Sequence, residues 1–495
     1  MIDKTFIVSL FTLIIADFPS TRVSADTTPQ KVILAGHIDN YNPEIPLKLQ
    51  LFKLGFTREV LNVEIDNKGN FHSTFETHIP TNAWVQYKTS FTVVLNPNDS
   101  LYVNFDGNAE KLDLLSTLQF TGSSAKTNQF VSAFESICWS DNIYMDWERN
   151  SKAMKEYDSE KYLAFLDTIE QENNKLYNKF ITEYSPDETS KIWAILQLKD
   201  RYYSLLSNYI ESKDLPKKFH NKLLELLPVN STMFISTITL NSYPYKYMKY
   251  IESKMKENRK EGDKWRFSPE GNFTAPKEVF DSIRIANVIK YTPDSILRQI
   301  AIVDIIGRTL QTQDIHSFEQ NETTIKQYIT LPFLREPLFK KYYEIKDRIE
   351  NPLFNSETEI INCKPLSGQQ IFENILQSNK RKIIYIDFWA TWCTPCLREF
   401  SNSKIIHESL KDNNIAFIYI CIDSEEKSGK ATIAEKQLSG QHYFLSKEQS
   451  REIKEFFEFD GIPFYILIDK NGKIKEKGYH LIPLEAKPKI EKMFN

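Results

Sequence analysis

IDFWATWCTPC, residues 386–396, is the segment that decides the fold of the C-terminal part of this 495-residue chain. It places Cys393 and Cys396 two residues apart, after an apolar strand-like run and before a helix-like run. The unpaired N–H groups and the positive dipole end of such a helix stabilise a thiolate on the first cysteine. The pKa of that thiol then falls from about 8.5 toward roughly 7 or below. We therefore expect Cys393 to attack a disulfide and Cys396 to resolve the mixed disulfide by closing the ring.

The residues around this pair fit the same chemistry. Pro395 stands in the first helical turn, where its missing N–H is not needed and its fixed φ suits the helix. The alternation along the strand should place the Asp387 side chain beneath the disulfide. A buried carboxyl has a raised pKa, so Asp387 can accept the proton of Cys396 as that thiol attacks. Trp389 and Trp392 are expected to shield the pair from bulk water.

The main alternative for the two cysteines is half of a zinc site. Zinc needs four ligands, and a second Cys/His pair with suitable spacing is absent from the sequence, so we predict a redox pair and no metal. The five cysteines do not form a disulfide framework. Cys421 lies within an apolar strand and is interpreted as a small buried residue. Cys138 and Cys363 form either a mutual bridge or two separate structural thiols.

Residues from about 365 to 495 resemble a thioredoxin domain, specifically that of the TlpA/ResA-type exported thiol–disulfide oxidoreductases. The resemblance rests on the run FWATWCTPC at 388–396, the later Gly-Ile-Pro at 461–463, and the DKNGK turn at 469–473. Two positions depart from the family pattern. Thr-Pro, not the Gly-Pro of thioredoxin, separates the cysteines, and Glu399 is not followed shortly by a proline. The first departure affects the redox potential, and the second affects only the helix path.

The resemblance assigns roles to four residues of this chain. Cys393 and Cys396 form the redox-active disulfide, and Asp387 serves as the proton acceptor. Pro463 is expected to follow a cis peptide bond, which removes a ladder donor and brings the backbone of Ile462 close to the cysteines. Two further residues, Trp392 and Ile462, are the predicted contacts for a substrate.

Composition and the N-terminus bound the class of protein. A net charge of −4 is too small to indicate binding to nucleic acid or to an anionic membrane surface. Residues 6–16 form an apolar run that is short for a bilayer span, and Val23-Ser24-Ala25 offers small residues for a signal peptidase. We predict a cleaved signal peptide and a soluble periplasmic or otherwise extracytoplasmic protein. A buried helix or an uncleaved anchor is the alternative for this run.

The length predicts about three domains. We divide the chain into a signal peptide (1–25), a β-rich domain (26–125), a helical middle region (126–352) and a thioredoxin-like domain (353–495). Alternation of Leu47, Leu49 and Leu51 with polar residues, and turn sequences at 66–70 and 96–100, indicate a small antiparallel β-sandwich. It resembles the β-rich domains joined to thioredoxin domains in Bacteroidetes-type exported proteins. The predicted fold class is therefore multidomain, with an α/β thioredoxin fold after a β-sandwich and an all-α region.

Apolar residues recur at every third or fourth position in several segments of the middle region. The predicted helices there are 161–184, 189–211, 217–227 and 295–308. In the last domain we predict a central strand at 385–389, the active-site helix at 395–410 and a parallel strand at 416–423. We further predict an inserted helix within 425–440, an antiparallel hairpin at 464–468 and 473–478, and a closing helix at 484–494.

The resemblance implies an exported thiol–disulfide oxidoreductase that reduces protein disulfides and needs no cofactor. A thiol donor in the membrane would regenerate the reduced pair. The Thr394-Pro395 dipeptide supplies no histidine to stabilise the thiolate further, which favours reduction over oxidation. Two alternatives stay open: a disulfide isomerase or oxidase that acts during secretion, and a binding or scaffold protein whose thioredoxin domain only fastens a partner.

Overall fold

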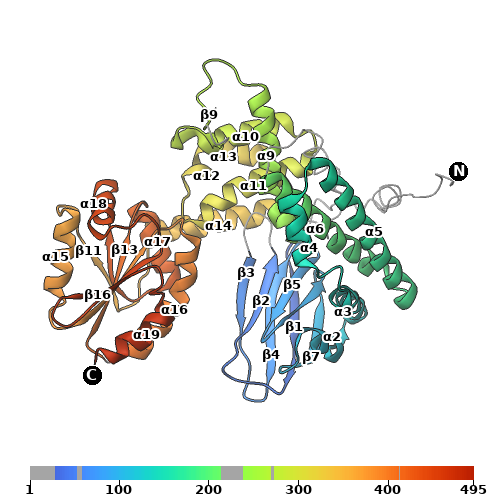
Figure 1. Cartoon of the computed structure of the whole chain (residues 1–495), viewed down its shortest axis with the longest axis horizontal. Coiled ribbons are helices and arrows are strands. Elements are labelled where there is room, and N and C mark those ends of the chain that lie inside the picture. The colour runs from blue at the N-terminus through green and yellow to red at the C-terminus, as the bar shows by residue number, and fades with distance from the viewer. Residues whose placement is uncertain (1–27, 53–57, 213–237, 269–271, 412, 495) are drawn as a thin grey trace. The chain divides into compact units, whose positions relative to one another are not determined.

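The computed structural model describes residues 28–52, 58–212, 238–268, 272–411 and 413–494 (Figure 1). The chain forms two compact units, residues 1–307 with 321–338, and residues 308–320 with 339–495. The predicted signal peptide at 1–25 and the predicted helix at 217–227 lie outside the described residues. No helix in the described ranges combines the length and the apolar character that a membrane span requires.

The first unit begins with a β-sandwich of two four-stranded sheets. Leu47, Leu49 and Leu51 are all at most 2% exposed and lie in the core between the sheets, which confirms the predicted alternation. One pairing departs from the expected antiparallel arrangement, because β1 and β7 run parallel. The first sheet has the order β4 (Asn70–Thr77), β1 (Gln30–Asp39), β7 (Ser100–Asp106) and β8 (Gln119–Gly122). The second has the order β3 (Arg58–Val63), β2 (Leu47–Phe52), β5 (Thr81–Gln86) and β6 (Ser90–Leu95).

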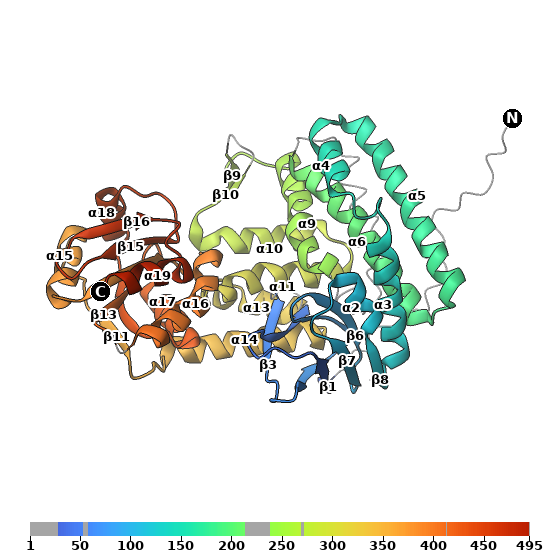
Figure 2. The same cartoon turned by 60° about the horizontal axis from the view of Figure 1, so that its bottom comes forward.

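Helix α3 (Ala125–Ser140) covers an outer strand of this sandwich (Figure 2). The side-chain amide of Asn128 accepts a hydrogen bond from the N–H of Val94 at 2.8 Å and donates one to its carbonyl at 2.9 Å. The hydroxyl of Thr92 donates to Glu135 of the same helix at 2.6 Å. These contacts occupy polar groups along β6 that would otherwise offer a template for strand pairing with another molecule.

A helical layer follows the sandwich within the first unit. The predicted helices at 161–184, 189–211 and 295–308 are confirmed as α5 (Ser159–Tyr184), α6 (Glu188–Ser212) and α11 (Ser295–Gln311). The prediction of a β-rich domain followed by helices did not include the short helix α2 (Lys111–Thr117) in the sandwich or the small hairpin of β9 (Arg266–Phe267) and β10 (Phe273–Thr274). The other helices of the middle region in this unit are α4 (Trp147–Glu156), α9 (Ile238–Glu257), α10 (Phe280–Tyr291) and α13 (Glu322–Tyr328). Helix α12 (His316–Gln320) belongs to the second unit, and α14 (Pro332–Glu350) begins in the first unit and continues into the second.

The second unit contains a six-stranded sheet that carries the cysteine pair. Its order is β11-β14-β13-β12-β15-β16, with β12 and β13 parallel and β15 antiparallel to both of its neighbours. The predicted strands and hairpin correspond to β12 (Ile383–Trp389), β13 (Ile415–Cys421), β15 (Phe464–Ile468) and β16 (Ile474–Gly478). The sequence did not reveal β11 (Thr358–Ile361) or β14 (Gly440–Phe444).

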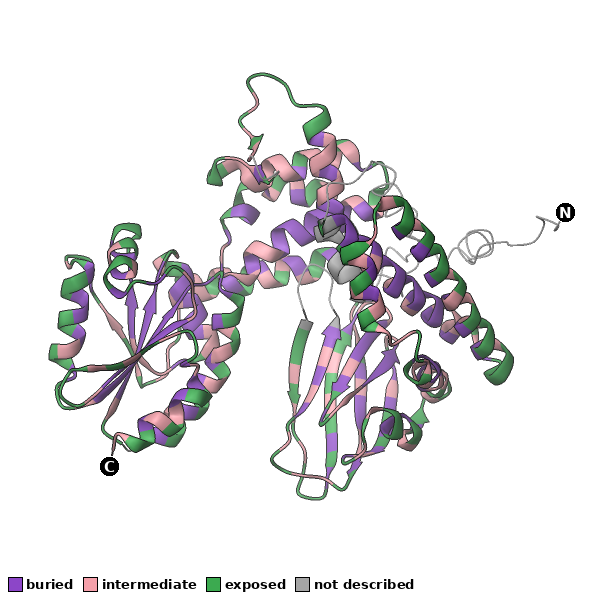
Figure 3. Cartoon of the chain, in the orientation of Figure 1, coloured by how far each residue is buried: buried purple, intermediate pink, exposed green. Residues whose placement is uncertain are grey.

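Helices cover both faces of this sheet, and its central strands β12, β13 and β15 are almost entirely buried (Figures 1 and 3). Helices α15 (Gly368–Ser378) and α18 (Lys447–Phe457) pack together on one face. Helices α16 (Thr394–Leu410) and α19 (Pro483–Lys492) pack together on the other. The predicted inserted helix is α17 (Glu426–Lys436). The cysteine pair therefore lies where the central strand β12 leads into α16.

Candidate active site

The two cysteines form a disulfide at the beginning of helix α16. Their Cα atoms are 5.3 Å apart. Cys393 is the N-cap residue of the helix, and its Sγ accepts a hydrogen bond from the backbone N–H of Cys396 at 3.2 Å. Pro395 lies in the first turn, as predicted. An N-terminal N–H group that points at Sγ, together with the helix dipole, stabilises negative charge on Cys393 when the pair is reduced.

The two sulfur atoms differ in their access to other molecules. Cys393 is 3% exposed, whereas Cys396 is 0% exposed. Cys393 is therefore the residue that a second molecule reaches first, in agreement with the expectation that it attacks and that Cys396 resolves. The assignment of these roles remains a prediction.

Asp387 lies on β12, two residues before Trp389 and on the same face of the strand, beneath α16. The residue is 0% exposed, and neither carboxyl oxygen has a hydrogen-bond partner within the described ranges. Burial raises the pKa of Asp387 well above its usual range, and the charge of Glu399 raises it further. A buried carboxyl whose pKa is raised in this way is suited to exchange a proton with a neighbouring thiol.

The two tryptophans of the motif have different environments, and only one of them is buried. Trp389 is 0% exposed and packs edge-on against Phe400 of α16, with ring centroids 5.1 Å apart. Trp392 is 54% exposed, and its indole N–H donates to the carbonyl of Asp423 at 3.0 Å. The expectation that both rings shield the cysteines stays a prediction for Trp392. Its ring stays at the surface because the hydrogen bond holds it against the loop that follows β13.

The peptide bond between Ile462 and Pro463 is cis, as predicted. Ile462 is partly buried and packs against the core cluster that contains both cysteines. Phe464 follows directly as the first residue of β15 and pairs with Phe388 of β12. The structure thus places the Gly-Ile-Pro motif at 461–463 near the C-terminal end of β12, which is the end that leads to the cysteine pair.

From the sequence, Glu399, one helical turn beyond Cys396, is interpreted as an exposed carboxylate of the helix, with a role in tuning the site as the alternative. It is instead partly buried, its Oε2 accepts a hydrogen bond from Asn402 at 2.9 Å, and its charge acts on Asp387. Tyr419 and Tyr465, which flank Asp387 on the neighbouring strands, were not recognised at all. The alternation of side chains along a strand assigns each tyrosine to one face of its own strand. The sequence contains no signal for the register between strands, so it does not show that these tyrosines pair with Asp387.

The other cysteines are free and buried, so the alternative of a bridge between Cys138 and Cys363 is wrong. Burial raises the pKa of Cys421 to about 12, so this thiol carries almost no thiolate near neutral pH. Among the described residues, no group of three or more His, Cys, Asp or Glu side chains is placed to hold a metal ion.

A helix-capping disulfide after the central strand, opposite a cis-proline that leads into an antiparallel hairpin, defines a thioredoxin-like domain. Comparison with known proteins supports this class. A family model described as thioredoxin-like matches residues 380–474. The chain is 26% identical to the thiol-disulfide oxidoreductase ResA of Bacillus cereus over 31% of its own length and 82% of the relative.

Two further similarities fall in the same region. The thioredoxin-like protein YneN of Bacillus subtilis is 29% identical over 22% of this chain and 49% of that protein. The solved thioredoxin domain of a Bacteroides vulgatus thiol-disulfide oxidoreductase is 27% identical over 24% of this chain and 84% of that domain, with a TM-score of 0.23. The C-terminal domain is therefore a thioredoxin-like oxidoreductase domain of the TlpA/ResA type.

Proposed function

We propose that this protein is an exported thiol–disulfide oxidoreductase that reduces protein disulfides through Cys393 and Cys396. One arrangement supports the proposal above all others. The more accessible sulfur caps helix α16, while the inaccessible sulfur belongs to a helix packed over a buried carboxyl that lacks any hydrogen bond in the described chain. A purely structural disulfide needs neither the helix N-terminus nor the carboxyl.

The reaction proceeds in two exchange steps. The Cys393 thiolate attacks a substrate disulfide, so that a bond forms between Cys393 and one substrate sulfur while the other leaves as a thiolate and takes a proton. Cys396 then transfers its proton to Asp387 and attacks the sulfur of Cys393. The mixed disulfide breaks, the second substrate thiol leaves, and the Cys393–Cys396 disulfide forms. Two electrons pass to the substrate, and a membrane thiol donor restores the dithiol.

Substrate contacts are assigned to the surface next to Cys393. Trp392 offers an exposed ring directly before the attacking cysteine. The partly buried Ile462 lies before the cis-proline and packs on the same core cluster. An extended segment of a substrate protein would lie along the Ile462 backbone with its disulfide at Cys393. Trp392→Ala should raise the KM for a protein disulfide more than it lowers kcat.

The direction of electron flow is tested by equilibrating the cysteine pair with glutathione buffers. A midpoint near that of thioredoxin, about −270 mV, supports a reductant, whereas one near about −120 mV identifies an oxidant. An intermediate value of about −180 mV would favour the isomerase alternative. Thr394 and Pro395 between the cysteines contribute no positive charge, in keeping with the reducing assignment.

The client proteins are tested by a trap. Cys396→Ala leaves Cys393 able to attack but removes the resolving thiol, so mixed disulfides accumulate and mass spectrometry identifies the captured partner. Clients captured outside the cytoplasm support both export and the signal peptide at 1–25. Full biological activity in a Cys393→Ser, Cys396→Ser double variant would instead favour the scaffold alternative, in which the regions at 26–125 and 126–352 form a binding module and the thioredoxin domain only fastens a partner.

A further inference from the structure

Asp387 lies at the centre of a polar row that crosses the sheet beneath α16. In the register of the strands, Asp387 of β12 pairs directly with Tyr419 of β13 on one side and with Tyr465 of β15 on the other. Tyr419 in turn pairs with His442 of β14. All four residues are 0% exposed. Side chains that are directly paired in a sheet point to the same face, with Cβ atoms about 5 Å apart.

The hydroxyl groups of the two tyrosines beside Asp387, Tyr419 and Tyr465, are buried and lack a hydrogen bond of normal geometry in the described part of the chain. Ser403 of α16 lies close enough to Tyr419 to act on its pKa, but its own hydroxyl is also buried without a bond of normal geometry. Buried polar groups are ordinarily paired, so a cluster of unpaired ones calls for a reason.

The other groups around the carboxyl do not stabilise its charge. Glu399 of α16 is negative and opposes ionisation of Asp387. The hydroxyl of Tyr385, on the same face of β12, donates to the carbonyl of Leu481 at 2.5 Å. His442 stacks on Tyr419 with ring centroids 5.0 Å apart, and burial lowers the pKa of His442 to about 3, so its ring is neutral.

A proton acceptor must reach its ionised form before it can act. Asp387 has to become a carboxylate in a fully buried site with no cation among the residues named above, and O–H dipoles are the remaining source of stabilisation. Tyr419 and Tyr465, which pair with Asp387 on the two neighbouring strands, each carry such a dipole. A phenol keeps its own proton near neutral pH, because burial and the charge of Asp387 raise the pKa of both tyrosines far above the usual range.

We propose that Tyr419 and Tyr465 are positioning residues that set the proton affinity of Asp387, by turning their hydroxyls toward its carboxylate when Cys396 gives up its proton. This inference rests on the proposed function, in which Asp387 accepts that proton. Neither tyrosine exchanges a proton or touches the reacting sulfur atoms. Loss of either hydroxyl should leave the carboxylate less stable, so that the acceptor works only at higher pH.

The test is stopped-flow reaction of the reduced full-length protein with dithiobis(nitrobenzoate), followed across a pH series. Attack by Cys393 releases one nitrothiobenzoate, and attack by Cys396 on the resulting mixed disulfide releases the second. The first phase therefore reports Cys393 and the second reports the step that involves Asp387. We expect Tyr419→Phe and Tyr465→Phe each to move the second-phase profile up by about half a pH unit to one unit. Their first-phase profiles should match that of the wild type, which also shows that the variants are folded.

Tyr385→Phe is the matched control, because it removes a buried phenol hydroxyl from the same face whose bond goes to Leu481 instead. It should leave both phases unchanged. In an Asp387→Asn background, Tyr419→Phe should no longer shift the second phase. The inference is wrong if the profiles of both tyrosine variants overlay that of the wild type, if Tyr385→Phe shifts the profile equally, or if the shift persists without Asp387. A wild-type protein that shows no second phase would overturn the proposed function itself, so the two failures are distinguishable.

Discussion

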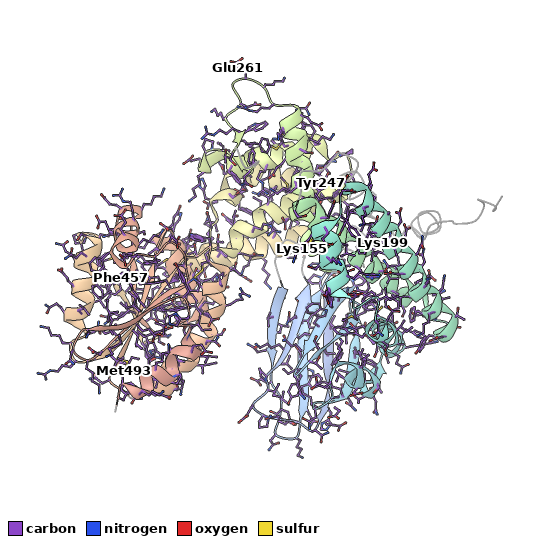
Figure 4. The ribbon with its side chains drawn as sticks, viewed as in Figure 1. Lys155, Lys199, Tyr247, Glu261, Phe457 and Met493 are labelled. Carbon is purple, nitrogen blue, oxygen red and sulfur yellow. A yellow bond between two sulfur atoms is a disulfide. The ribbon has the colours of Figure 1, made fainter. Side chains whose placement is uncertain are left out.

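On strand β12, Ile386 points into the layer beneath α15 and α18, whereas the next residue, Asp387, points beneath α16 and α19. The core of the first layer is built mainly from apolar side chains, with Cys363 and Tyr443 as its titratable groups, and is completed by residues such as Phe457 of α18. The second layer holds the disulfide, a carboxyl and several buried hydroxyl groups beside its apolar residues, and Met493 packs at its edge. Figure 4 labels Phe457 and Met493, which mark the two layers.

The two faces of the sheet therefore contribute differently: the α15/α18 layer stabilises the fold, whereas the α16/α19 layer also carries the groups proposed to react. Burial of apolar side chains stabilises the α15/α18 layer in a manner that does not depend on pH. The α16/α19 layer contains groups whose pKa values burial has displaced, so its contribution to stability changes with pH. Successive residues of the same strands serve both purposes because strand side chains alternate between faces.

The largest effect is expected from Cys393→Ser. A serine hydroxyl is not ionised near neutral pH and does not attack disulfides, so insulin reduction should fall to the rate of the buffer alone. Cys421→Ala is the control, because Cys421 belongs to the same core cluster but lies mid-strand, where burial keeps it a thiol. It should retain exchange activity. Substantial turnover by Cys393→Ser would show that the helix N-terminus is not the source of reactivity.

On the apolar layer, Ile386→Ala should destabilise the sheet by about 2–5 kcal/mol, since it leaves a cavity among side chains that are fully buried. Hydrogen–deuterium exchange of peptides from β12 and β13, read by mass spectrometry, measures this local free energy. The loss of local free energy of unfolding in Ile386→Ala, relative to the wild type, should be the same at every pH. A deficit that varied with pH would contradict the division between the two layers.

On the polar layer, Asp387→Asn should stabilise the sheet relative to the wild type as the pH rises. The folded protein retains the Asp387 proton at pH values where the unfolded chain, with a pKa of about 4, has lost it. The free energy of unfolding of the wild type therefore falls above pH 4, by up to about 1.4 kcal/mol per pH unit until the folded pKa is passed. The variant lacks this slope. Stability profiles that run parallel for the two proteins between about pH 5 and pH 8 would refute the raised pKa of Asp387.

The smallest effect at neutral pH is expected from His442→Gln, and it should emerge only in acid. Burial lowers the pKa of His442 to about 3, while its Nε2 lies 2.9 Å from the carbonyl of Leu438. Its contribution is complete above the unfolded pKa of about 6.5 and is lost as the pH falls toward 3, by up to about 1.4 kcal/mol per pH unit. Glutamine keeps an N–H donor without titrating. Wild-type and variant stabilities should therefore converge or cross on acidification, and a constant difference would count against a buried neutral imidazole.

Local patterns in the sequence predicted the elements around the cysteine pair closely. The strand before Cys393, the helix after it and the later hairpin agree with β12, α16, β15 and β16 within a few residues. The cis peptide bond before Pro463 was predicted because the Gly-Ile-Pro sequence at 461–463 resembles that of thioredoxin domains. Strand β14 was missed because Gly440–Phe444 is short and follows a helical segment, so its period of two residues is not distinct.

The sequence by itself determined that a thiol stands at the start of a helix, because the features that are expected to activate Cys393 are all local. A cysteine at the start of a helix meets the N–H group three residues further on wherever that helix lies in the fold. The tertiary structure alone decided what surrounds Asp387. Tyr419 and Tyr465 reach it from strands that are distant in the chain, and their register is set by packing of the whole sheet, which no local pattern encodes.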